Sequence, residues 1–365
     1  MKLRRLVLKN FRNVEYAEIL PGPGFNILWG ENAQGKTNIL EAIYLLGHLK
    51  SFRGARNEDL IRRDTPFSRL TAEVSKGDIR HSVGLTIQGQ GKSARVDGKT
   101  VAKSGEFLGW FSSVLFAPEE VGLARGFPAG RRALLDRAVF QADPTFLESA
   151  REFQRLLKQR NRLLKEGSRA EQLAPWTEGL IVAGARVRLF RTRYLKRLVP
   201  LLQETYRSIT DGREEADLVC PSAGETEIEL QEQLRLELKQ RAVRESALGT
   251  TLAGPHRDDP YFTVNGQSLR VFGSQGQQRS FMLAFKTAQI MDLEKNAGIQ
   301  PVLLLDDMTG ELDRKRQEFF FHFLRGRRGQ VFVTTTELQS MANKGFCEIQ
   351  SFRVNEGTLQ PMDCQ

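Results

Sequence analysis

The sequence predicts an α/β nucleotide-binding fold that is interrupted by a helical insertion. Residues 30–37 read Gly-Glu-Asn-Ala-Gln-Gly-Lys-Thr and fit the phosphate-binding pattern GxxxxGK(S/T). Residues 301–305 form an aliphatic run that ends in two aspartates, as expected for a buried parallel strand beside a nucleotide. Long segments with helical periodicity lie between these motifs. We therefore expect a discontinuous nucleotide-binding lobe and a separate helical lobe.

Length and composition narrow the class of protein. The chain has 365 residues, which is too long for one ordinary core. It contains no apolar run near roughly 18 residues and no signal-peptide pattern, so we expect a cytoplasmic protein with no membrane contact. Its three scattered cysteines predict ordinary thiols and no structural zinc. The net charge of +10 suggests a polyanionic partner, although an even surface excess of Lys and Arg would give the same total.

The first element is a hairpin. Residues 2–8 and 15–19 have strand-like patterns, and residues 10–13 (Asn-Phe-Arg-Asn) break them. Arg12 and Asn13 are candidates for contact with the nucleotide, although the same residues also fit a plain polar turn.

The phosphate loop has the local context that its chemistry requires. An apolar run at residues 24–29 predicts a buried strand before it, and residues 38–49 predict a helix after it. Glycine lets backbone N–H groups close on phosphate oxygens, and the helix N-terminus adds partial positive charge. Lys36 is placed to reach the β and γ oxygens of ATP, and the hydroxyl of Thr37 is placed to bind Mg²⁺. The expected nucleotide-binding residues of the loop are Gly30, Glu31, Asn32, Ala33, Gln34, Gly35, Lys36 and Thr37.

Short strands follow the first helix. Residues 70–74, 81–88 and 94–96 alternate in polarity and are separated by turn residues, which predicts an antiparallel sheet. The loop 51–54 between helix and sheet shows no functional pattern. Residues 107–116 are apolar again, and a turn at 117–120 begins the helical region.

The helical region is basic. We expect helices at residues 144–167, 176–210 (one helix, or two with a kink at Pro200) and 227–248. Residues 125–215 hold 19 Lys and Arg against 11 Asp and Glu, so the positive charge is concentrated there. A DNA-binding helix face is one interpretation, and a solvated surface is the other. The candidate DNA-binding residues are Arg186, Arg193, Lys196 and Arg197.

Strand signals return near the C-terminus. Residues 261–264 and 269–272 flank Asn265-Gly266 and predict a hairpin. Residues 274–279 (Ser-Gln-Gly-Gln-Gln-Arg) precede a predicted helix at 280–295, and their serine and glycine predict a second anion site at a helix N-terminus. After the aliphatic strand, Asp306 and Asp307 are costly to bury unless they meet a cation such as Mg²⁺. The last core strand is expected at residues 330–334, before a hairpin-like tail.

These motifs, in this order, resemble the ATPase heads of the ABC superfamily that includes SMC and Rad50 proteins, and within it the RecF family of bacterial recombination mediators. The most specific segments are residues 10–13, 30–37, 254–259 (Gly-Pro-His-Arg-Asp-Asp), 274–279, 303–307 and 311–313. The interval between Thr37 and Ser274 is too short for the long coiled coils of SMC or Rad50 proteins. The resemblance therefore implies an ABC-type head at residues 1–116 and 250–365 and a compact basic helical arm at 117–249.

The resemblance also assigns roles to residues. It implies that Asp306 holds Mg²⁺ through water, that Asp307 orients the attacking water while Lys36 binds the phosphates, and that Thr336 stands where other members have a switch histidine. Transporter-type members carry Glu at the position of Asp307. RecF proteins differ from them in the same way as this chain does. Two sets of residues complete the implied site: the signature, acting on the partner subunit's nucleotide, is Ser274, Gln275, Gly276 and Gln277, and the D-loop contains Glu311 and Asp313.

The implied function is a slow, Mg²⁺-dependent ATPase of recombinational repair and replication restart. The resemblance implies an ATP-dependent homodimer that binds gapped or junction DNA, acts with RecO and RecR in loading RecA, and contributes to the SOS response. His256 is open to two interpretations, a functional residue or a packing residue.

Two rival functions stay open. One is a nucleotide-switched scaffold, in which ATP only joins two heads and hydrolysis is incidental. Such a scaffold would tolerate a change of Asp307. The other is the ATPase subunit of a transporter, which would carry a histidine after the last core strand and lack clustered basic charge.

Overall fold

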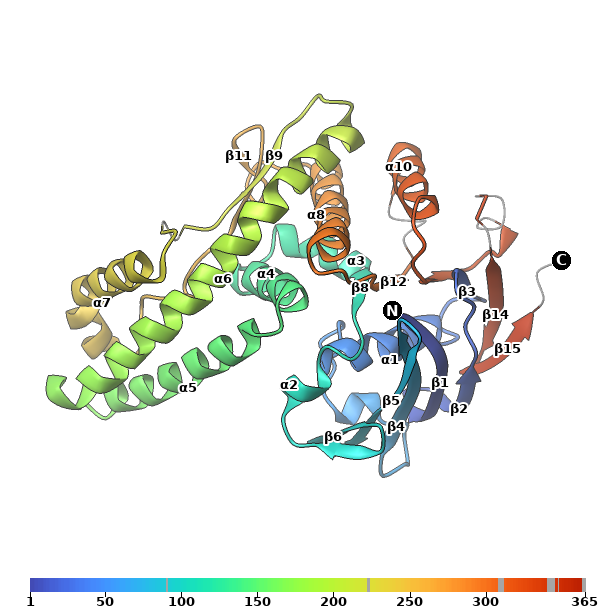
Figure 1. The fold of residues 1–365 in the computed structure, drawn as a ribbon, viewed down its shortest axis with the longest axis horizontal. Coiled ribbons are helices and arrows are strands. Elements are labelled where there is room, and N and C mark those ends of the chain that lie inside the picture. Colours follow the sequence, from blue (N-terminus) through green and yellow to red (C-terminus); the bar gives the residue numbers. More distant parts are fainter. Residues whose placement is uncertain (90, 222–223, 308–311, 340–344, 347, 363–365) are drawn as a thin grey trace. The chain divides into compact units, whose positions relative to one another are not determined.

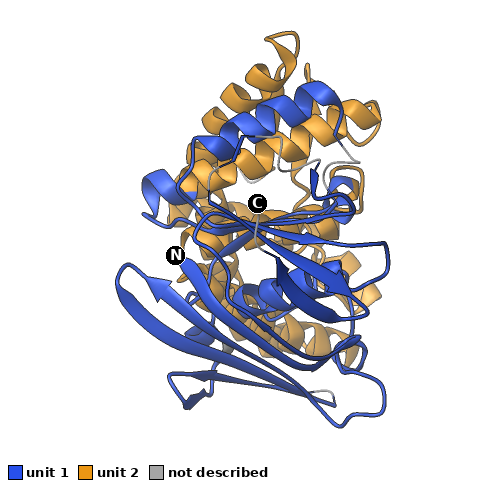
Figure 2. Ribbon diagram, turned by 90° about the vertical axis from the view of Figure 1, so that its right-hand side faces the viewer, with its two compact units in different colours: residues 1–121, 293–365 blue, residues 122–292 orange. Residues whose placement is uncertain are grey.

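The structure is a computed structural model that describes residues 1–89, 91–221, 224–307, 312–339, 345–346 and 348–362. Residue contacts divide the chain into two compact units (Figure 2): unit 1 comprises residues 1–121 and 293–365, and unit 2 comprises residues 122–292. None of the helices in these described ranges combines the length and apolar composition that a membrane crossing requires.

A mixed sheet forms the centre of unit 1 (Figure 1), with strand order β15-β14-β3-β13-β12-β8. Its parallel strands are β3 (Phe25–Trp29), β8 (Ser113–Phe116), β12 (Val302–Leu305), β13 (Val331–Thr335) and β14 (Ile349–Asn355). β15 (Thr358–Met362) pairs antiparallel with β14 at the edge. Strands buried on both faces read as continuous apolar runs, which is why β3, β12 and β13 could be predicted. The carboxyl ends of the parallel strands meet at one edge, where ligands of such sheets bind.

The second sheet of unit 1 is antiparallel, with strand order β2-β1-β4-β5-β6-β7. Its strands are β1 (Lys2–Phe11), β2 (Val14–Ile19), β4 (Ser68–Lys76), β5 (Ile79–Gln88), β6 (Gly91–Val96) and β7 (Lys99–Val101). One face packs into a core that it shares with α1 (Lys36–His48) and the mixed sheet. The alternation of apolar and polar residues follows from this one-sided burial, and the predicted hairpin and meander are confirmed.

The remaining elements in the described part of unit 1 are short, apart from one helix. They are η1 (Glu58–Leu60), α2 (Ser104–Phe107), α3 (Pro118–Val121) and α10 (Arg314–Arg325).

Unit 2 is mainly helical. Its helices are η2 (Gly122–Ala124), α4 (Pro128–Ala142), α5 (Phe146–Lys165), α6 (Ala170–Thr210), α7 (Glu227–Leu248) and most of α8 (Gln275–Asn296). A small antiparallel sheet has strand order β11-β10-β9, formed by β9 (Ala216–Val219), β10 (Tyr261–Val264) and β11 (Gln267–Ser268).

In unit 2 the structure adds one helix, decides between two alternatives for another, and corrects one predicted strand. α4 was not predicted, because its apolar residues are spread around the helix and give no periodic face. Residues 176–210 were expected as one helix or as two with a kink at Pro200, and the structure has one helix, α6, which continues through Pro200 between buried Leu198 and Leu202. The predicted strand at residues 269–272 is a turn, since the N–H groups of Val271 and Phe272 donate to the carbonyl of Ser268.

The compact units also divide differently from the predicted domains. The first boundary lies close to the expected residue 117, but residues 250–292 pack with the helical unit. β10 pairs with β9, and buried Asp258 accepts hydrogen bonds from Arg188 (2.7 Å) and Arg191 (3.4 Å) of α6. A buried carboxylate requires such partners, so the segment 254–259 is bound to the helices.

Candidate nucleotide site

The loop between β3 and α1 has a backbone that only glycine adopts easily. Gly30 has a φ of 149°, and a Cβ there would lie 2.4 Å from the carbonyl oxygen of Val354. Gly35 has a φ of 109°, and a Cβ there would lie 2.8 Å from the side-chain amide of Asn13. A side chain at either position would clash, so the close course of the loop depends on glycine, as a loop that wraps phosphate oxygens requires.

Lys36 lies inside this loop. Its ammonium group donates to the carbonyl oxygens of Gly30 (2.6 Å) and Glu31 (2.7 Å). Burial lowers the pKa of Lys36, while the nearby charges of Asp307 and Asp306 oppose that shift. A phosphate group would replace these carbonyls as the partner and favour the charged form.

Asp306 and Thr37 meet at the carboxyl end of β12. Asp306 Oδ1 accepts hydrogen bonds from the hydroxyls of Thr37 (2.9 Å) and Thr334 (2.8 Å). Burial raises the pKa of Asp306, and the charges of Glu119 and Asp307 add to the effect. A carboxylate and a hydroxyl converging beside a phosphate loop fit Mg²⁺, which prefers hard oxygen ligands and retains several waters.

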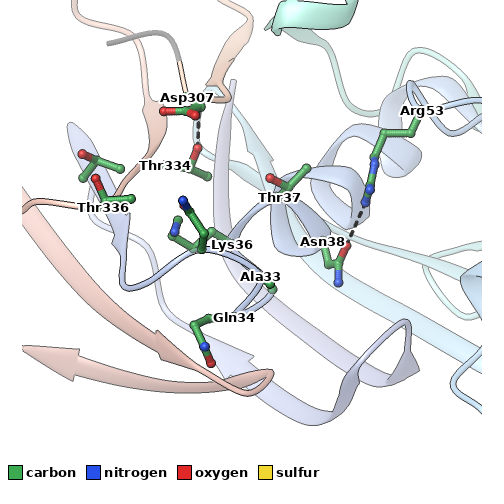
Figure 3. Close-up of a pocket in the computed structure, with 12 residues that line it drawn as sticks. Ala33, Gln34, Lys36, Thr37, Asn38, Arg53, Asp307, Thr334 and Thr336 are labelled. Carbon is green, nitrogen blue, oxygen red and sulfur yellow. Dashed lines mark hydrogen bonds between the residues drawn. The ribbon is translucent and has the colours of Figure 1, made fainter. Parts of the chain in front are cut away.

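Asp307 has a left-handed backbone, with a φ of 46°. Its N–H donates to the hydroxyl of Thr334 at 2.9 Å (Figure 3). Since that hydroxyl also donates to Asp306, one threonine contacts both aspartates. The side chain of Asp307 is exposed and faces the cavity beside the loop. Thr336, the predicted switch position, lines the same cavity.

The cavity has a volume of about 360 Å³. It is lined by Asn32, Ala33, Gln34, Gly35, Lys36, Thr37, Asn38, Arg53, Asp307, Thr334, Thr335 and Thr336. Most of the predicted loop residues, Asp307 and Thr336 are therefore brought together, as expected.

Arg53 was missed by the sequence analysis. Its guanidinium donates to Asn38 Oδ1 at 3.1 Å, which holds it at the edge of the cavity (Figure 3). The loop 51–54 has no distinctive composition, and only its position beside α1 identifies Arg53 as a candidate phosphate or nucleoside contact.

Arg12 and Asn13, the other candidates for nucleotide contact, lie next to the cavity and do not line it. Arg12 forms two hydrogen bonds of 2.9 Å with Glu41, whose side chain is fully buried. Asn13 donates to the carbonyl of Gln34 at 3.2 Å and accepts from Asn38. Both residues line a neighbouring hollow of about 770 Å³ in place of the cavity itself. Asn13 therefore contacts the phosphate loop at Gln34, and Arg12 is ion-paired with Glu41 of α1.

Glu41 connects this support to Arg53. The hydroxyl of Ser51 donates to Glu41 and accepts the N–H groups of Arg53 (3.0 Å) and Ala55 (3.3 Å). Glu41 on α1 thus fixes both the Arg12 turn and the loop that carries Arg53.

Glu119 is a second residue that no motif indicated. β8 pairs with β12 in a register that places Phe116 opposite Leu305. Glu119 follows in α3, and its charge contributes to the raised pKa of Asp306. Only the pairing of the two strands brings it to this edge.

The predicted signature belongs to unit 2. Ser274 Oγ accepts the N–H of Gln277 (3.1 Å), and Gln277 Oε1 accepts the N–H of Ser274 (2.9 Å), a reciprocal cap at the start of α8. Gln277 also donates to Glu214 at 2.8 Å. Gln275 and Gly276 form the first residues of α8.

The D-loop is only partly within the described ranges. Glu311 lies outside the described residues. Asp313 caps α10 by accepting the N–H of Arg316 at 3.0 Å, and it also pairs with the Arg316 guanidinium.

Three of the four candidate DNA-binding residues of α6 are ion-paired within unit 2. Arg186 pairs with Glu227 (3.0 Å), Lys196 with Glu225 (2.8 Å) and Arg197 with Asp292 (3.1 Å). Arg193 is exposed, and no ion pair joins it to any described residue. The positive charge that this face offers to a ligand is therefore smaller than the sequence suggested.

The chain is similar to known proteins over nearly its whole length. A family model described as RecF/RecN/SMC N terminal domain matches residues 2–358. The DNA replication and repair protein RecF of Syntrophotalea carbinolica is 56% identical, covering 98% of this chain and 99% of the relative. That of Geobacter sulfurreducens is 43% identical, covering 99% and 100%.

Solved structures agree as well. A structure of the recombination mediator protein RecF with ATP in the RecFOR pathway is 29% identical, covers 99% of both chains and has a TM-score of 0.91. An Smc head domain from Pyrococcus furiosus is 16% identical over 100% of this chain and 96% of that one, with a TM-score of 0.57, and supports the fold alone.

Proposed function

The chain belongs to the RecF family of DNA replication and repair proteins, and we propose that it is a slow Mg²⁺-dependent ATPase whose ATP-bound dimer holds DNA. The observation that carries the proposal is the convergence of Lys36, Thr37, Asp306 and Asp307 on one edge of the mixed sheet.

ATP would occupy the cavity with its phosphates in the loop 30–37. Lys36 would exchange the carbonyls of Gly30 and Glu31 for the β and γ oxygens. Thr37 would bind Mg²⁺ directly and Asp306 through water, and the ion would supply charge neutralisation on the phosphates. Asp307, exposed toward the cavity, would orient the attacking water. An aspartate reaches less far than the glutamate of transporter-type members, which favours slow turnover.

The signature supports a dimer. A single nucleotide already has a complete cradle at residues 30–37, so the helix N-terminus at Ser274 would serve the nucleotide of a second subunit. A two-fold symmetric dimer would then contain two composite sites.

Membership of the family supports a proposal about DNA and protein partners. A relative's structure is described as part of the RecFOR pathway. We propose that this chain binds gapped or single-strand/double-strand junction DNA in the cytoplasm, acts with RecO and RecR to assist RecA loading, and contributes to the SOS response. Arg186, Arg193, Lys196 and Arg197 stay candidates for DNA contact, with Arg193 the most available.

Mixing two inactive variants tests the composite site. Lys36→Ala removes the phosphate contact, and loss of one such donor typically lowers turnover about 100- to 1000-fold. Ser274→Arg blocks the signature. Each variant alone should be nearly inactive, but their heterodimer joins the intact cradle of one to the intact signature of the other. Equal mixing should restore up to about a quarter of wild-type ATPase, because half the dimers are mixed and each has one whole site.

Two results would contradict the proposal. One is wild-type turnover by Lys36→Ala. The other is no recovery at any mixing ratio, provided that both variants fold and exchange subunits. Asp307→Asn distinguishes the proposed ATPase from the rival scaffold, in which hydrolysis is incidental. A scaffold with that substitution would still support DNA repair in cells normally.

A further inference from the structure

The antiparallel sheet of unit 1 has one buried face and one open face. One cross-strand row is buried and consists of Leu8, Leu70, Leu85 and Ala94. Side chains alternate along a strand, so the next row points to the opposite face. That row consists of Lys9, Arg69, Thr86 and Ser93. The strands β1, β4, β5 and β6 lie side by side and present this face together (Figure 1).

Two positive charges face each other on this surface. Lys9 and Arg69 are exposed and occupy directly opposite positions on β1 and β4. Like charges at opposite positions destabilise a sheet. Both cations lie near the ring of Phe67, at 6.0 and 5.5 Å from its centroid, which offsets part of the repulsion. No carboxylate among the described residues pairs with either cation, so an external anion would relieve the repulsion.

A third cation extends the surface. Arg95 on β6 is exposed and lies opposite Gly84 on β5 and Thr100 on β7. Within the described ranges it has no ion-pair partner. Adjacent strands are about 4.8 Å apart, so β4 and β6 place Arg69 and Arg95 on the order of 10 Å apart across the sheet.

The residues between these cations are short and polar. They are Thr71, Gly84, Thr86 and Ser93. Short side chains let a large ligand approach the sheet, and hydroxyls, lysine and arginine are the side chains that contact DNA phosphates.

Two carboxylates of this face, Glu18 and Glu73, share one cation, Arg5, and so offset part of its positive charge. Arg5 pairs with Glu18 (2.7 Å) and lies 3.7 Å from Glu73. The contrast with α6 is informative, because there the cations Arg186 and Lys196 have carboxylate partners. The open sheet face therefore presents uncompensated positive charge of the kind that complements a nucleic-acid backbone.

We propose that this face binds the sugar-phosphate backbone of duplex DNA, with Lys9, Arg69 and Arg95 each neutralising one phosphate. The proposal rests on the DNA-binding part of the proposed function and adds a second surface, on unit 1, to the arm. Contacts about 10 Å apart fit phosphates on the two sides of a DNA groove, which is about 6 to 12 Å wide.

The test is the salt dependence of DNA binding. Lys9→Gln, Arg69→Gln and Arg95→Gln are combined, and affinity for a fluorescent gapped DNA duplex is measured with ATP by anisotropy. Loss of three phosphate contacts should flatten the log-log salt slope by about 2.7. Between about 50 and 200 mM salt, the wild type should lose about 40-fold more affinity than the variant. ATP binding should be unchanged, and the thermal midpoint should not fall, because the substitutions also remove the repulsion between Lys9 and Arg69.

A matched control removes the same charge elsewhere. Arg155, Arg162 and Arg235 are exposed residues of unit 2 with ion-pair partners, and changing all three to Gln should alter the slope much less. If the wild type binds DNA but the sheet variant has the wild-type salt slope, the sheet proposal is overturned. A face that binds an acidic protein and no DNA would give this result. If the wild type itself does not bind DNA in ATP, the proposed function fails instead.

Discussion

His256 should make unit 2 sensitive to acid. Its Nε2 donates to the carbonyl of Thr251 at 3.1 Å, and its ring packs near Phe153. Nδ1 is buried, and no described residue forms a hydrogen bond with it. Burial lowers the pKa of His256 to about 4, and the charges of Arg257 and Arg132 act in the same direction. The contacts favour the packing interpretation of this residue over a functional one.

The sign and size of the effect follow from the two pKa values. An unfolded histidine has a pKa near 6.5, so the unfolded chain binds a proton more readily than the folded chain. The stability is present above pH 6.5 and is lost as the pH falls from 6.5 toward 4. Each pH unit in this window corresponds to about 1.4 kcal/mol, so the loss between pH 7 and pH 5 is about 2 kcal/mol.

The substitution His256→Gln removes the titration and keeps a donor for Thr251. Trp176 reports on unit 2 alone once Trp29 and Trp110 are changed to Phe, since the chain has three tryptophans. Urea unfolding followed by its fluorescence should show that the wild type loses about 2 kcal/mol more than the variant between pH 7 and pH 5.

The matched control is His322→Gln, which removes an exposed histidine of unit 1 and should keep the wild-type pH dependence. Equal acid sensitivity of wild type and His256→Gln would refute the reasoning.

Three further substitutions test unit 1. Asp307→Asn should retain ATP binding but lower phosphate release by roughly 100-fold or more, leaving a trapped dimer in light scattering; normal hydrolysis would make Asp307 structural. Asp306→Asn should raise the thermal midpoint of the nucleotide-free protein at pH 7.5 by a few degrees, because burial raises the pKa of Asp306 and the charged form costs stability once the pH is above that pKa. It should also lose Mg²⁺-dependent turnover, and a lower midpoint would contradict the argument. Glu41→Ala should destabilise unit 1 by about 3–5 kcal/mol by leaving Arg12 unpaired. Combining it with Arg12→Met should recover part of the loss, and additive losses would show that the pair is unimportant.

The parts of the site that could be predicted from the sequence are those whose structure depends on local sequence pattern. The loop 30–37, the strand before it and the helix after it are continuous in the chain, so one segment contains the whole argument. Asp306 and Asp307 could be found because a carboxylate pair at the end of an aliphatic strand is unusual.

The features that the sequence could not predict depend on contacts between distant segments. Arg12 was a candidate either for nucleotide contact or for a plain polar turn, and its ion pair with buried Glu41 on another element is visible only in the fold. Arg53 lies in a loop without pattern and becomes notable only because Asn38 holds it beside the cavity. Sequence spacing predicts which side chains share a face, but it does not predict what that face meets.

The basic arm illustrates the same limit for charge. Buried arginines are stable only with partners, and unit 2 supplies them: Arg131 pairs with Asp259, Arg160 with Glu245, and Arg188 with Asp258 and Glu237. Part of the positive excess counted along residues 125–215 is therefore internal to the fold. Asp258 and Asp259 belong to the segment 254–259 and lie outside that count, so a local tally overstates the charge available to DNA. On the open sheet of unit 1 the opposite holds, because Lys9, Arg69 and Arg95 are few but uncompensated by any described carboxylate. What attracts a polyanion is charge left unpaired by the fold, and by that measure the four candidate residues of α6 offer less than their number suggests, because three of them have carboxylate partners.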